Sequence, residues 1–300
     1  MALRIFDDRD RELLFVRPPR RIVSLVPSDT LSLFELGGGQ SVVGRTRYCV
    51  APEGKVESIA IVGGTKDVDG DAVAALEPDL VIANQEENTK AQVEALARLN
   101  LPVFVAFPKT VAAGLNHLAR LARILGVEAV PEVRDLLKRG LKAISDAEAA
   151  RLVKKPLRAF VPIWRDPLMT VAEATFVSDA LRLGGADNVF ADRRRLYPLK
   201  ADQGKAPPLA AAEVAGRDDR YPRITDAELL ERAPDVILLP DEPHPFSEED
   251  AAHFRAMDLP AAKSGRVVRC GGRDLSWYGS QSVEGIGRLR ALIDSLRDLK

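Results

Sequence analysis

The residues best suited to chemistry are carboxylates that follow two similar apolar segments. Glu86 follows Pro78-Asp79-Leu80-Val81-Ile82, and Glu242 follows Pro234-Asp235-Val236-Ile237-Leu238 at an offset of 156 residues. If both segments are parallel strands, the two carboxylates lie at matching strand ends, where open sheets bind their ligands. Such a pair could act as general acid and base if the carboxylates approach within several Å. The alternative is that both acids only begin helices, because the helix dipole favours negative charge there.

Histidine adds one further candidate at the same strand end. His244 follows Glu242 closely and could contact or ligate something there, whereas His117 and His253 fall on predicted helices with packing or surface roles. A transition-metal site needs several His, Cys or carboxylate ligands that converge. Only Glu86, Glu242 and His244 could converge here, so the sequence predicts no site for a bare metal ion.

Aromatic residues are scarce, at 5% of the chain, and their positions are informative. Four of them are predicted in loops or at strand ends: Tyr48, Trp164, Trp277 and Tyr278. Large flat side chains beside a cleft would stack on a planar or bulky ligand. The alternative is ordinary packing between two domains.

Composition and missing motifs exclude several functional classes. No hydrolase elbow, phosphate loop or complete dinucleotide motif is present. The 43 basic and 44 acidic residues give a net charge of −1, which argues against nucleic acid as a partner. No apolar run approaches the roughly 18 residues of a membrane span. With two cysteines, Cys49 and Cys270, and no signal-type apolar core near residue 1, we expect a cytoplasmic protein, or a periplasmic one if an upstream start is missing.

A second pair of similar segments accompanies the two Pro-Asp segments described above. Leu36-Gly37-Gly38, with Val42 four residues later, recurs as Leu183-Gly184-Gly185 with Val189, at an offset of 147 residues. Two similar offsets in the same order indicate two copies of one α/β unit, although such short motifs also recur by chance. We therefore expect two similar lobes with mostly parallel sheets and a small-molecule cleft between them.

Alternating strand and helix patterns with short connections support this organisation. Ser28 or Asp29 is expected to cap the first helix. The predicted hairpin pairs residues 3–6 with 13–16; the predicted strands are 22–26, 79–83, 102–106, 157–161, 235–239 and 266–269; the predicted helices are 30–36, 71–76, 89–99, 110–125, 176–183, 225–232, 248–256 and 283–298.

A long helix is expected between the two lobes. Apolar residues at Val133, Leu137 and Leu141 lie on one face of a helix that starts at Pro131 and runs to about Val153. At ~1.5 Å per residue it is roughly 35 Å long, enough to link two lobes stiffly and to limit their closure. The predicted domains are an N-terminal α/β lobe (1–109), a helical connector (110–155) and a C-terminal α/β lobe (156–300).

The ordered set of motifs resembles one protein family. The motifs are Arg21–Ser28, Pro78–Asn84, Leu183–Val189 and Trp277-Tyr278. Together they are similar to the helical-backbone metal-receptor superfamily, the class III substrate-binding proteins of ABC importers, and are nearest its cobalamin-binding branch. The resemblance spans roughly residues 3–298. It implies a periplasmic-binding-protein-like fold and non-catalytic binding of a metal chelate, which would be a corrinoid such as cobalamin, a haem or a ferric chelate.

The chain departs from this family at three places. The family carries an acidic residue that docks on the permease in each lobe; Asp71 matches the first position, but Ala227 occupies the second. Asn84 stands where the cobalamin receptor has an aromatic residue, and Gly279-Ser280 replaces a Glu-Arg pair. Both the ligand and an ABC permease as partner are therefore left open.

The leading hypothesis is a binding protein without catalysis. Two alternatives remain: an enzyme on the same scaffold that processes a cofactor with Glu86 and Glu242, and a cytoplasmic sensor or scaffold module. In the leading hypothesis the apolar and stacking contacts come from Tyr48, Thr65, Trp164, Trp277 and Tyr278, and the polar contacts from Glu86, Arg165, Glu242 and His244.

Overall fold

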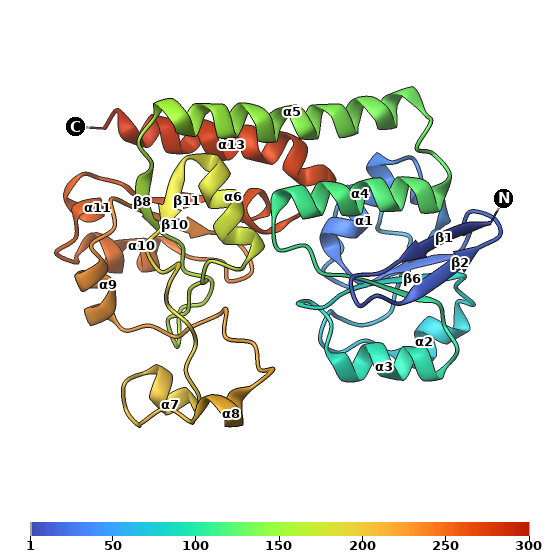
Figure 1. The fold of residues 1–300 in the computed structure, drawn as a ribbon, viewed down its shortest axis with the longest axis horizontal. Coiled ribbons are helices and arrows are strands. Elements are labelled where there is room, and N and C mark those ends of the chain that lie inside the picture. The colour runs from blue at the N-terminus through green and yellow to red at the C-terminus, as the bar shows by residue number, and fades with distance from the viewer. Residues whose placement is uncertain (1, 300) are drawn as a thin grey trace. The chain divides into compact units, whose positions relative to one another are not determined.

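The chain divides into two compact α/β units in a computed structural model that describes residues 2–299 (Figure 1). Unit 1 comprises the chain up to Lys142 together with Trp277–Val283, and unit 2 comprises Ala143–Ser276 and the chain from Glu284 onward. The prediction of two α/β lobes is confirmed. The separate connector over residues 110–155 stays a prediction.

A five-stranded parallel sheet forms the centre of unit 1. Its order is β5-β4-β3-β6-β7, and all neighbouring strands are parallel. The strands after β3 are added first on one side of it (β4, β5) and then on the other (β6, β7). The carboxyl ends of β3 and β6 therefore flank the switch point at which open sheets bind ligands. Every residue of β3, β6 and β7 is buried, as expected for strands covered on both faces. The strands are β3 (Ile22–Ser24), β4 (Val42–Arg45), β5 (Ala60–Ile61), β6 (Leu80–Asn84) and β7 (Val103–Ala106), beside the predicted antiparallel hairpin of β1 (Leu3–Phe6) and β2 (Glu12–Phe15).

Helices cover both faces of this sheet. In Figure 1, α2 and α3 lie on one face and α4 on the other. Val81 of β6 packs with Val93 and Leu96 of α3 in one buried cluster. Thr89 and Thr110 cap α3 and α4 with their side chains. The helices are α1 (Pro27–Glu35), α2 (Gly70–Ala75), α3 (Lys90–Arg98), α4 (Val111–Leu125) and the first part of α5 (Pro131–Val153), with a short 3₁₀ turn η1 (Gly39–Ser41).

The first helix begins earlier than the sequence predicts. It starts at Pro27, its N-cap is Val26, and no side chain caps it, so the capping role predicted for Ser28 or Asp29 is wrong. The fixed φ of proline suits the first helical position, which allows the helix to follow β3 almost directly. Asp29 therefore lies inside the first turn, where it is buried and binds side chains distant in sequence.

A four-stranded parallel sheet forms the centre of unit 2. Its order is β11-β10-β8-β9, which places the switch point between β8 and β10. An aromatic cluster packs against it: the ring of Phe160 lies 5.5 Å from that of Phe190 and 6.0 Å from that of Phe254. The strands are β8 (Leu157–Phe160), β9 (Ala186–Asn188), β10 (Val236–Pro240) and β11 (Val267–Cys270).

The helices of unit 2 follow the predicted plan, with four short helices that the sequence does not predict. Residues 192–222, which have no counterpart in unit 1, contain the short helices α7 and α8. The repeat is also imperfect at its end, because Val42 lies inside β4 whereas Val189 follows β9. The long helix α5, of 23 residues, has the predicted bounds and is shared by both units. The remaining helices are α6 (Phe176–Gly184), α7 (Leu199–Asp202), α8 (Ala211–Val214), α9 (Asp226–Arg232), α10 (Glu248–Arg255), α11 (Pro260–Lys263), α12 (Arg273–Ser276) and α13 (Ser280–Arg297).

The repeated Pro-Asp motif has the same structural role in both units. The carboxylate of Asp79 accepts the backbone N–H groups of Arg20 and Arg21, at 2.9 and 2.8 Å. The carboxylate of Asp235 accepts the backbone N–H of Arg158 at 2.9 Å. Each aspartate thus ties the amino end of one central strand to that of its neighbour. Within residues 2–299, no helix is both long and apolar enough to cross a bilayer.

Candidate ligand-binding site

A buried polar network lies at the carboxyl ends of β3 and β6 in unit 1. Nε2 of His117 lies 2.7 Å from Oδ1 of Asp29, and the hydroxyl of Tyr278 donates to Oδ2 of Asp29 at 2.8 Å. Nδ2 of Asn84 donates to the Tyr278 oxygen at 3.1 Å. All four side chains are buried, so each polar atom depends on its partner in the network.

Burial also determines the protonation of Tyr278. It raises the pKa of the Tyr278 hydroxyl well above its ordinary value, and the neighbouring Asp29 carboxylate raises it further. The hydroxyl is therefore a protonated donor at neutral pH. The ring of His117 packs 5.5 Å from the ring of Tyr278 and 5.8 Å from that of Phe104, which closes the network with apolar surface.

Asn84 links this network to the loop that carries Glu86. Its Oδ1 accepts the backbone N–H groups of Glu86 and Glu87, at 2.6 and 3.2 Å. Its own backbone N–H donates to Oδ1 of Asn88 at 2.9 Å. Asn84, which departs from the family pattern, therefore fixes the loop after β6 through hydrogen bonds to residues 86–88. It does this with hydrogen bonds, where an aromatic residue would offer only a ring.

Three predicted contact residues of unit 1 come together around this loop. Thr65 is buried and hydrogen-bonds the carboxyl of Glu87, while the Lys66 ammonium donates to the Glu86 carbonyl. Burial raises the pKa of Glu87, the charge of Lys66 opposes this, and the charge of Glu86 adds to it. Tyr48 is 53% exposed, so its side chain is accessible to a ligand.

The ring of Tyr48 is supported from one side. The guanidinium of Arg47 lies 5.8 Å from its centroid and is itself held by Asp67 at 2.8 Å. Gly64 also lies against this pair, because a Cβ there would come within 3.1 Å of Cε2 of Tyr48. The lack of a side chain at residue 64 thus lets the loop of Thr65 pack closely on Tyr48.

An exposed ring and a half-buried ring meet at the corresponding position of unit 2. Trp164 follows β8 and His244 follows β10, the two strands at the switch point, and their ring centroids are 5.3 Å apart. The ring of His244 also contacts Phe246 at 4.7 Å. Trp164 is 45% exposed, and its indole N–H donates to the carbonyl of Asp166 at 3.1 Å, which fixes the ring plane. The arrangement offers a flat, oriented apolar surface.

The charged residues predicted beside these rings already have partners. Nε of Arg165 lies 3.2 Å from Oδ1 of Asp250. Burial alone would raise the pKa of Asp250, but hydrogen bonds from Ser247 and the charge of Arg165 lower it below its usual value. Arg165 is thus an oriented cation that a ligand would share with a carboxylate.

Glu242 is held by α12 and lies against the glycine that precedes this helix. Oγ of Ser276 donates to its Oε1 at 3.5 Å, and Nε of Arg273 lies 4.0 Å from its Oε2. A Cβ at Gly272 would come within 2.5 Å of the Glu242 carbonyl oxygen, so glycine is required for this close approach. Glu242 belongs to unit 2 and Glu86 to unit 1.

Trp277 and Tyr278 lie in the predicted loop before the last helix, but they are only 7% and 5% exposed. Neither ring therefore offers the open surface that Tyr48 and Trp164 offer. The sequence does not indicate that Asp29 pairs with His117, because it predicts a capping role for Asp29 and a packing or surface role for His117. The available signal was an acid directly after a buried strand, together with a histidine on the apolar face of a helix.

The predicted permease-docking positions differ between the units. Asp71 is exposed in the first turn of α2. Ala227 lies in the first turn of α9, and its acidic neighbours already have partners: Asp226 lies 3.6 Å from His253, and Glu228 both caps the helix and pairs with Arg193 at 2.8 Å.

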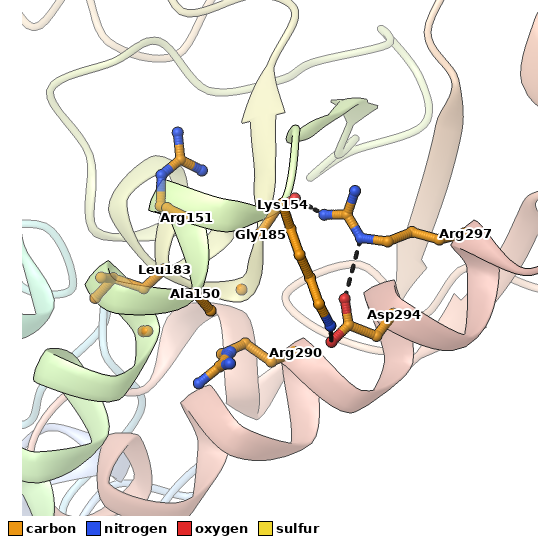
Figure 2. Close-up of a pocket in the computed structure, with 10 residues that line it drawn as sticks. Ala150, Arg151, Lys154, Leu183, Gly185, Arg290, Asp294 and Arg297 are labelled. Carbon is orange, nitrogen blue, oxygen red and sulfur yellow. Dashed lines mark hydrogen bonds and ion pairs between the residues drawn. The ribbon is translucent and has the colours of Figure 1, made fainter.

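A pocket within unit 2 has a different character. It occupies about 240 Å³, including space open to solvent, between α5, α6 and α13 (Figure 2). Because this volume includes open solvent, the enclosed space is far smaller than the roughly 300–1,000 Å³ of ordinary ligand pockets. Lys154 and Arg297 both bind Asp294, at 2.7 and 3.0 Å, and Arg151 pairs with Asp187 outside it. None of the predicted contact residues lines this pocket, so we do not assign the ligand to it. Elsewhere within residues 2–299, no group of three His, Cys, Asp or Glu side chains is placed to hold a metal ion.

Comparison with known proteins identifies relatives of this chain. The family model described as "Periplasmic binding protein" matches residues 22–273. The vitamin B12-binding protein of Yersinia pestis is 28% identical over 179 residues, which are 59% of this chain and 62% of that relative. The chain thus aligns with less than two thirds of that relative's length.

Solved structures share the fold at low sequence identity. The periplasmic vitamin B12 binding protein of Vibrio cholerae has a TM-score of 0.72 at 19% identity, covering 94% of this chain and 99% of that one. The periplasmic haem-binding protein of Roseiflexus sp. RS-1 has a TM-score of 0.72 at 18% identity, covering 92% and 98%. A Helicobacter pylori protein solved with Ni(II) bound has a TM-score of 0.76 at 16% identity, covering 98% and 89%. The first two are described as periplasmic, so the predicted cytoplasmic location is not supported.

Proposed function

Because this chain belongs to the periplasmic binding protein family, we propose that it binds a metal-chelate ligand and releases it unchanged. The predicted resemblance to the class III substrate-binding proteins is confirmed. This family consists of binding proteins and not enzymes, so the prediction of a non-catalytic protein is confirmed as well. The chelate that we place first is a corrinoid such as cobalamin, and the next candidates are haem and a ferric chelate.

The observation that carries this proposal is the pair of rings at the switch point of unit 2. Trp164 is oriented by its own hydrogen bond and backed by His244, yet nearly half exposed. A soluble protein that holds an indole open to solvent at this position offers stacking area for a flat macrocycle. Macrocyclic chelates carry their own metal ligands, so the protein needs to supply only surface and hydrogen bonds.

Unit 1 would supply a second set of contacts to the ligand. Tyr48 offers an exposed ring, and the Glu86 loop offers polar groups whose positions are fixed by Asn84. Amide or carboxylate groups on the rim of a chelate would find donors and acceptors there. We propose that Tyr48, Thr65, Glu86, Trp164, Arg165, Glu242 and His244 contact the ligand.

Trp277 and Tyr278 would support the site mainly as buried residues. Their rings are nearly closed to solvent, and the Tyr278 hydroxyl ties Asp29 to Asn84, which in turn positions Glu86. We propose that Tyr278 positions the polar loop of unit 1, and that Trp277 contacts the ligand with its small exposed edge.

We further propose that the chain works in the periplasm and delivers its ligand to an ABC permease. The periplasmic relatives support this location. The exposed Asp71 is available for docking, whereas Ala227 supplies no charge on unit 2. Docking would therefore depend more strongly on Asp71 than on any residue near Ala227.

A visible-spectrum titration of the full chain tests the proposed function. The probes are cyanocobalamin, haem and a ferric catecholate chelate. We expect one of them to give a saturable change at one equivalent, and Trp164→Ala to weaken that binding about tenfold through loss of stacking area. The control is Leu152→Ala, which removes an exposed apolar side chain from α5 and should bind as the wild type does. No saturable change with any probe would overturn the proposal.

A further inference from the structure

Six arginines are concentrated between residues 193 and 223 of unit 2, and three of them have carboxylate partners. Arg193 lies 3.0 Å from Asp202, Arg194 lies 3.6 Å from Asp219, and Arg220 lies 2.6 Å from Asp218. The other three are Arg195, Arg217 and Arg223.

Arg195 and Arg223 bury donor atoms that have no acceptor. Nε of Arg195 and both Nε and Nη1 of Arg223 are buried without a hydrogen-bond partner within residues 2–299. The two arginines lie in neighbouring segments, because the backbone N–H groups of Leu196 and Arg223 bind the two oxygens of one carboxylate, that of Asp202. Burial lowers the pKa of Arg223, and the charge of Arg195 lowers it further. A pair of partly buried like charges with unused donors is unfavourable without an anion between them.

The two aspartates whose charges act on this pair, Asp202 and Asp218, already bind other donors. Asp202 is buried and already accepts hydrogen bonds from Arg193, from the backbone of Leu196 and from the backbone of Arg223, at 3.0, 2.9 and 2.7 Å. Both oxygens of Asp218 accept from Arg220. Asp202 and Asp218 are therefore engaged by other donors, and the buried Nε of Arg195 and the Nε and Nη1 of Arg223 make no hydrogen bond to them. An acceptor from outside the chain would satisfy these donors.

The position of Arg195 is fixed by aromatic packing. Its guanidinium lies 4.6 Å from the ring centroid of Tyr197, and that of Arg217 lies 5.2 Å from the same ring. The Tyr197 hydroxyl donates to the carbonyl of Asp218 at 2.6 Å. Arg195 is thus pre-oriented, which reduces the entropy lost when it binds a partner.

We propose that Arg195 and Arg223 form an oxyanion-binding subsite that takes a carboxylate or phosphate group. A guanidinium presents a planar fork of donors that matches the oxygens of either group. Arg217, which is exposed, adds positive charge at the edge. The chemical class of the ligand follows from these donors alone and does not depend on which chelate the protein carries.

The subsite lies close to the exposed indole of unit 2. Arg223 pairs with Met169 in an antiparallel bridge, and Met169 pairs in the same way with Trp164. The three backbone segments therefore run side by side. The oxyanion could be a free anion or an acidic group on the chelate that stacks on Trp164, and this second source rests on the proposed function.

Calorimetric titration of the full chain with inorganic phosphate tests the subsite. We expect saturable binding to the wild type and a loss of about tenfold or more in affinity for Arg195→Gln and for Arg223→Gln, because each removes charge-assisted hydrogen bonds. The control is Arg194→Gln, which removes an exposed, already paired arginine and should bind phosphate as the wild type does. No phosphate binding by the wild type, or unchanged binding by both test variants, would overturn the proposal.

Thermal unfolding in buffer without phosphate or sulfate tests whether a variant loses phosphate binding only because it is unfolded. We expect the midpoint of Arg223→Gln to equal or exceed that of the wild type there, because an unpaired, partly buried cation has been removed. Added phosphate should raise the midpoint of the wild type and leave that of Arg223→Gln unchanged. Equal rises in both proteins would count against the subsite.

Competition identifies the source of the oxyanion. If haem, through its propionate carboxylates, or cobalamin, through its phosphodiester, fills the subsite, phosphate will weaken chelate binding in the wild type and not in Arg223→Gln. If a free anion is the natural occupant, phosphate and chelate will bind independently. Both results support the subsite, and because the phosphate titration needs no chelate, its outcome is separate from that of the proposed function.

Discussion

The carboxyl ends of the two sheets lie at equivalent topological positions, but the side chains there differ in the two units. In unit 1, β3 leads directly into α1 at Pro27, and the strand end is sealed by the network of Asp29, His117, Tyr278 and Asn84. In unit 2, a turn from Trp164 to Met169 intervenes before α6, and aromatic rings are left open. One unit uses its polar residues to fix its own loops, while the other exposes a surface for stacking.

The amino ends of the same sheets are alike. Asp79 and Asp235 both tie neighbouring strands together through backbone N–H groups, and Gly37 and Gly185 both adopt positive φ after a helix. The repeated motifs of the sequence therefore lie at the amino ends of the strands, where they stabilise each sheet. The difference between the units lies at the carboxyl ends of the sheets, where we propose that the ligand binds and where the repeat weakens.

The largest effect is expected from breaking the buried network of unit 1. Asp29→Ala leaves His117 and Tyr278 without their buried acceptor and should lower the free energy of unfolding by about 3–5 kcal/mol. Denaturant unfolding measures this loss. Asp71→Ala, at an exposed position in α2 of the same unit, is the control and should change stability by less than about 0.5 kcal/mol. A loss below about 1 kcal/mol for Asp29→Ala would show that the network does not hold unit 1 together.

A smaller effect is expected from substituting the equivalent aspartates of the two units, Asp79 and Asp235. Asp79 accepts backbone N–H groups from two residues and Asp235 from one. We expect Asp79→Ala to cost about 2 kcal/mol and Asp235→Ala about 1 kcal/mol, because each lost bond joins a charged acceptor to a partly exposed backbone. The same unfolding experiment ranks the pair, and the opposite order would contradict this account of the repeat.

The smallest effect is expected from Tyr278→Phe, and it depends on pH. The folded-state pKa of Tyr278 is raised above the ordinary value of 10.0, so its contribution to stability is complete below about pH 10 and is lost as the pH rises toward the folded-state value. Removing the hydroxyl should cost about 1 kcal/mol at pH 7 and flatten the fall in stability above pH 10. Stability is measured by denaturant unfolding from pH 7 to 11.

Tyr48→Phe is the control for this pH dependence. Its ring is half exposed, so loss of its hydroxyl should leave the alkaline fall of the wild type in place. If Tyr278→Phe follows the same alkaline curve as the wild type and Tyr48→Phe, the buried hydroxyl does not govern that fall.

The sequence predicts the fold well because the fold follows local patterns. The bounds of α5 follow from helical periodicity and Pro131, and the two sheets follow from apolar runs with short connections. The buried network could not be predicted in this way. His117 is 88 residues from Asp29, and Tyr278 is 249 residues from it, so no local pattern relates them. The same reason explains why the sequence favours a helix cap at Asp29 and accessible contact rings at Trp277 and Tyr278.

Calorimetric titration with cyanocobalamin and with haem tests the central claim most directly, namely that this chain binds one chelate through its exposed rings. We predict one binding event per chain for one of these ligands, weakened about tenfold in Trp164→Ala and to a smaller extent in Tyr48→Ala, with the stoichiometry unchanged. Heat without saturation for both ligands, or full affinity in both variants, would contradict the account.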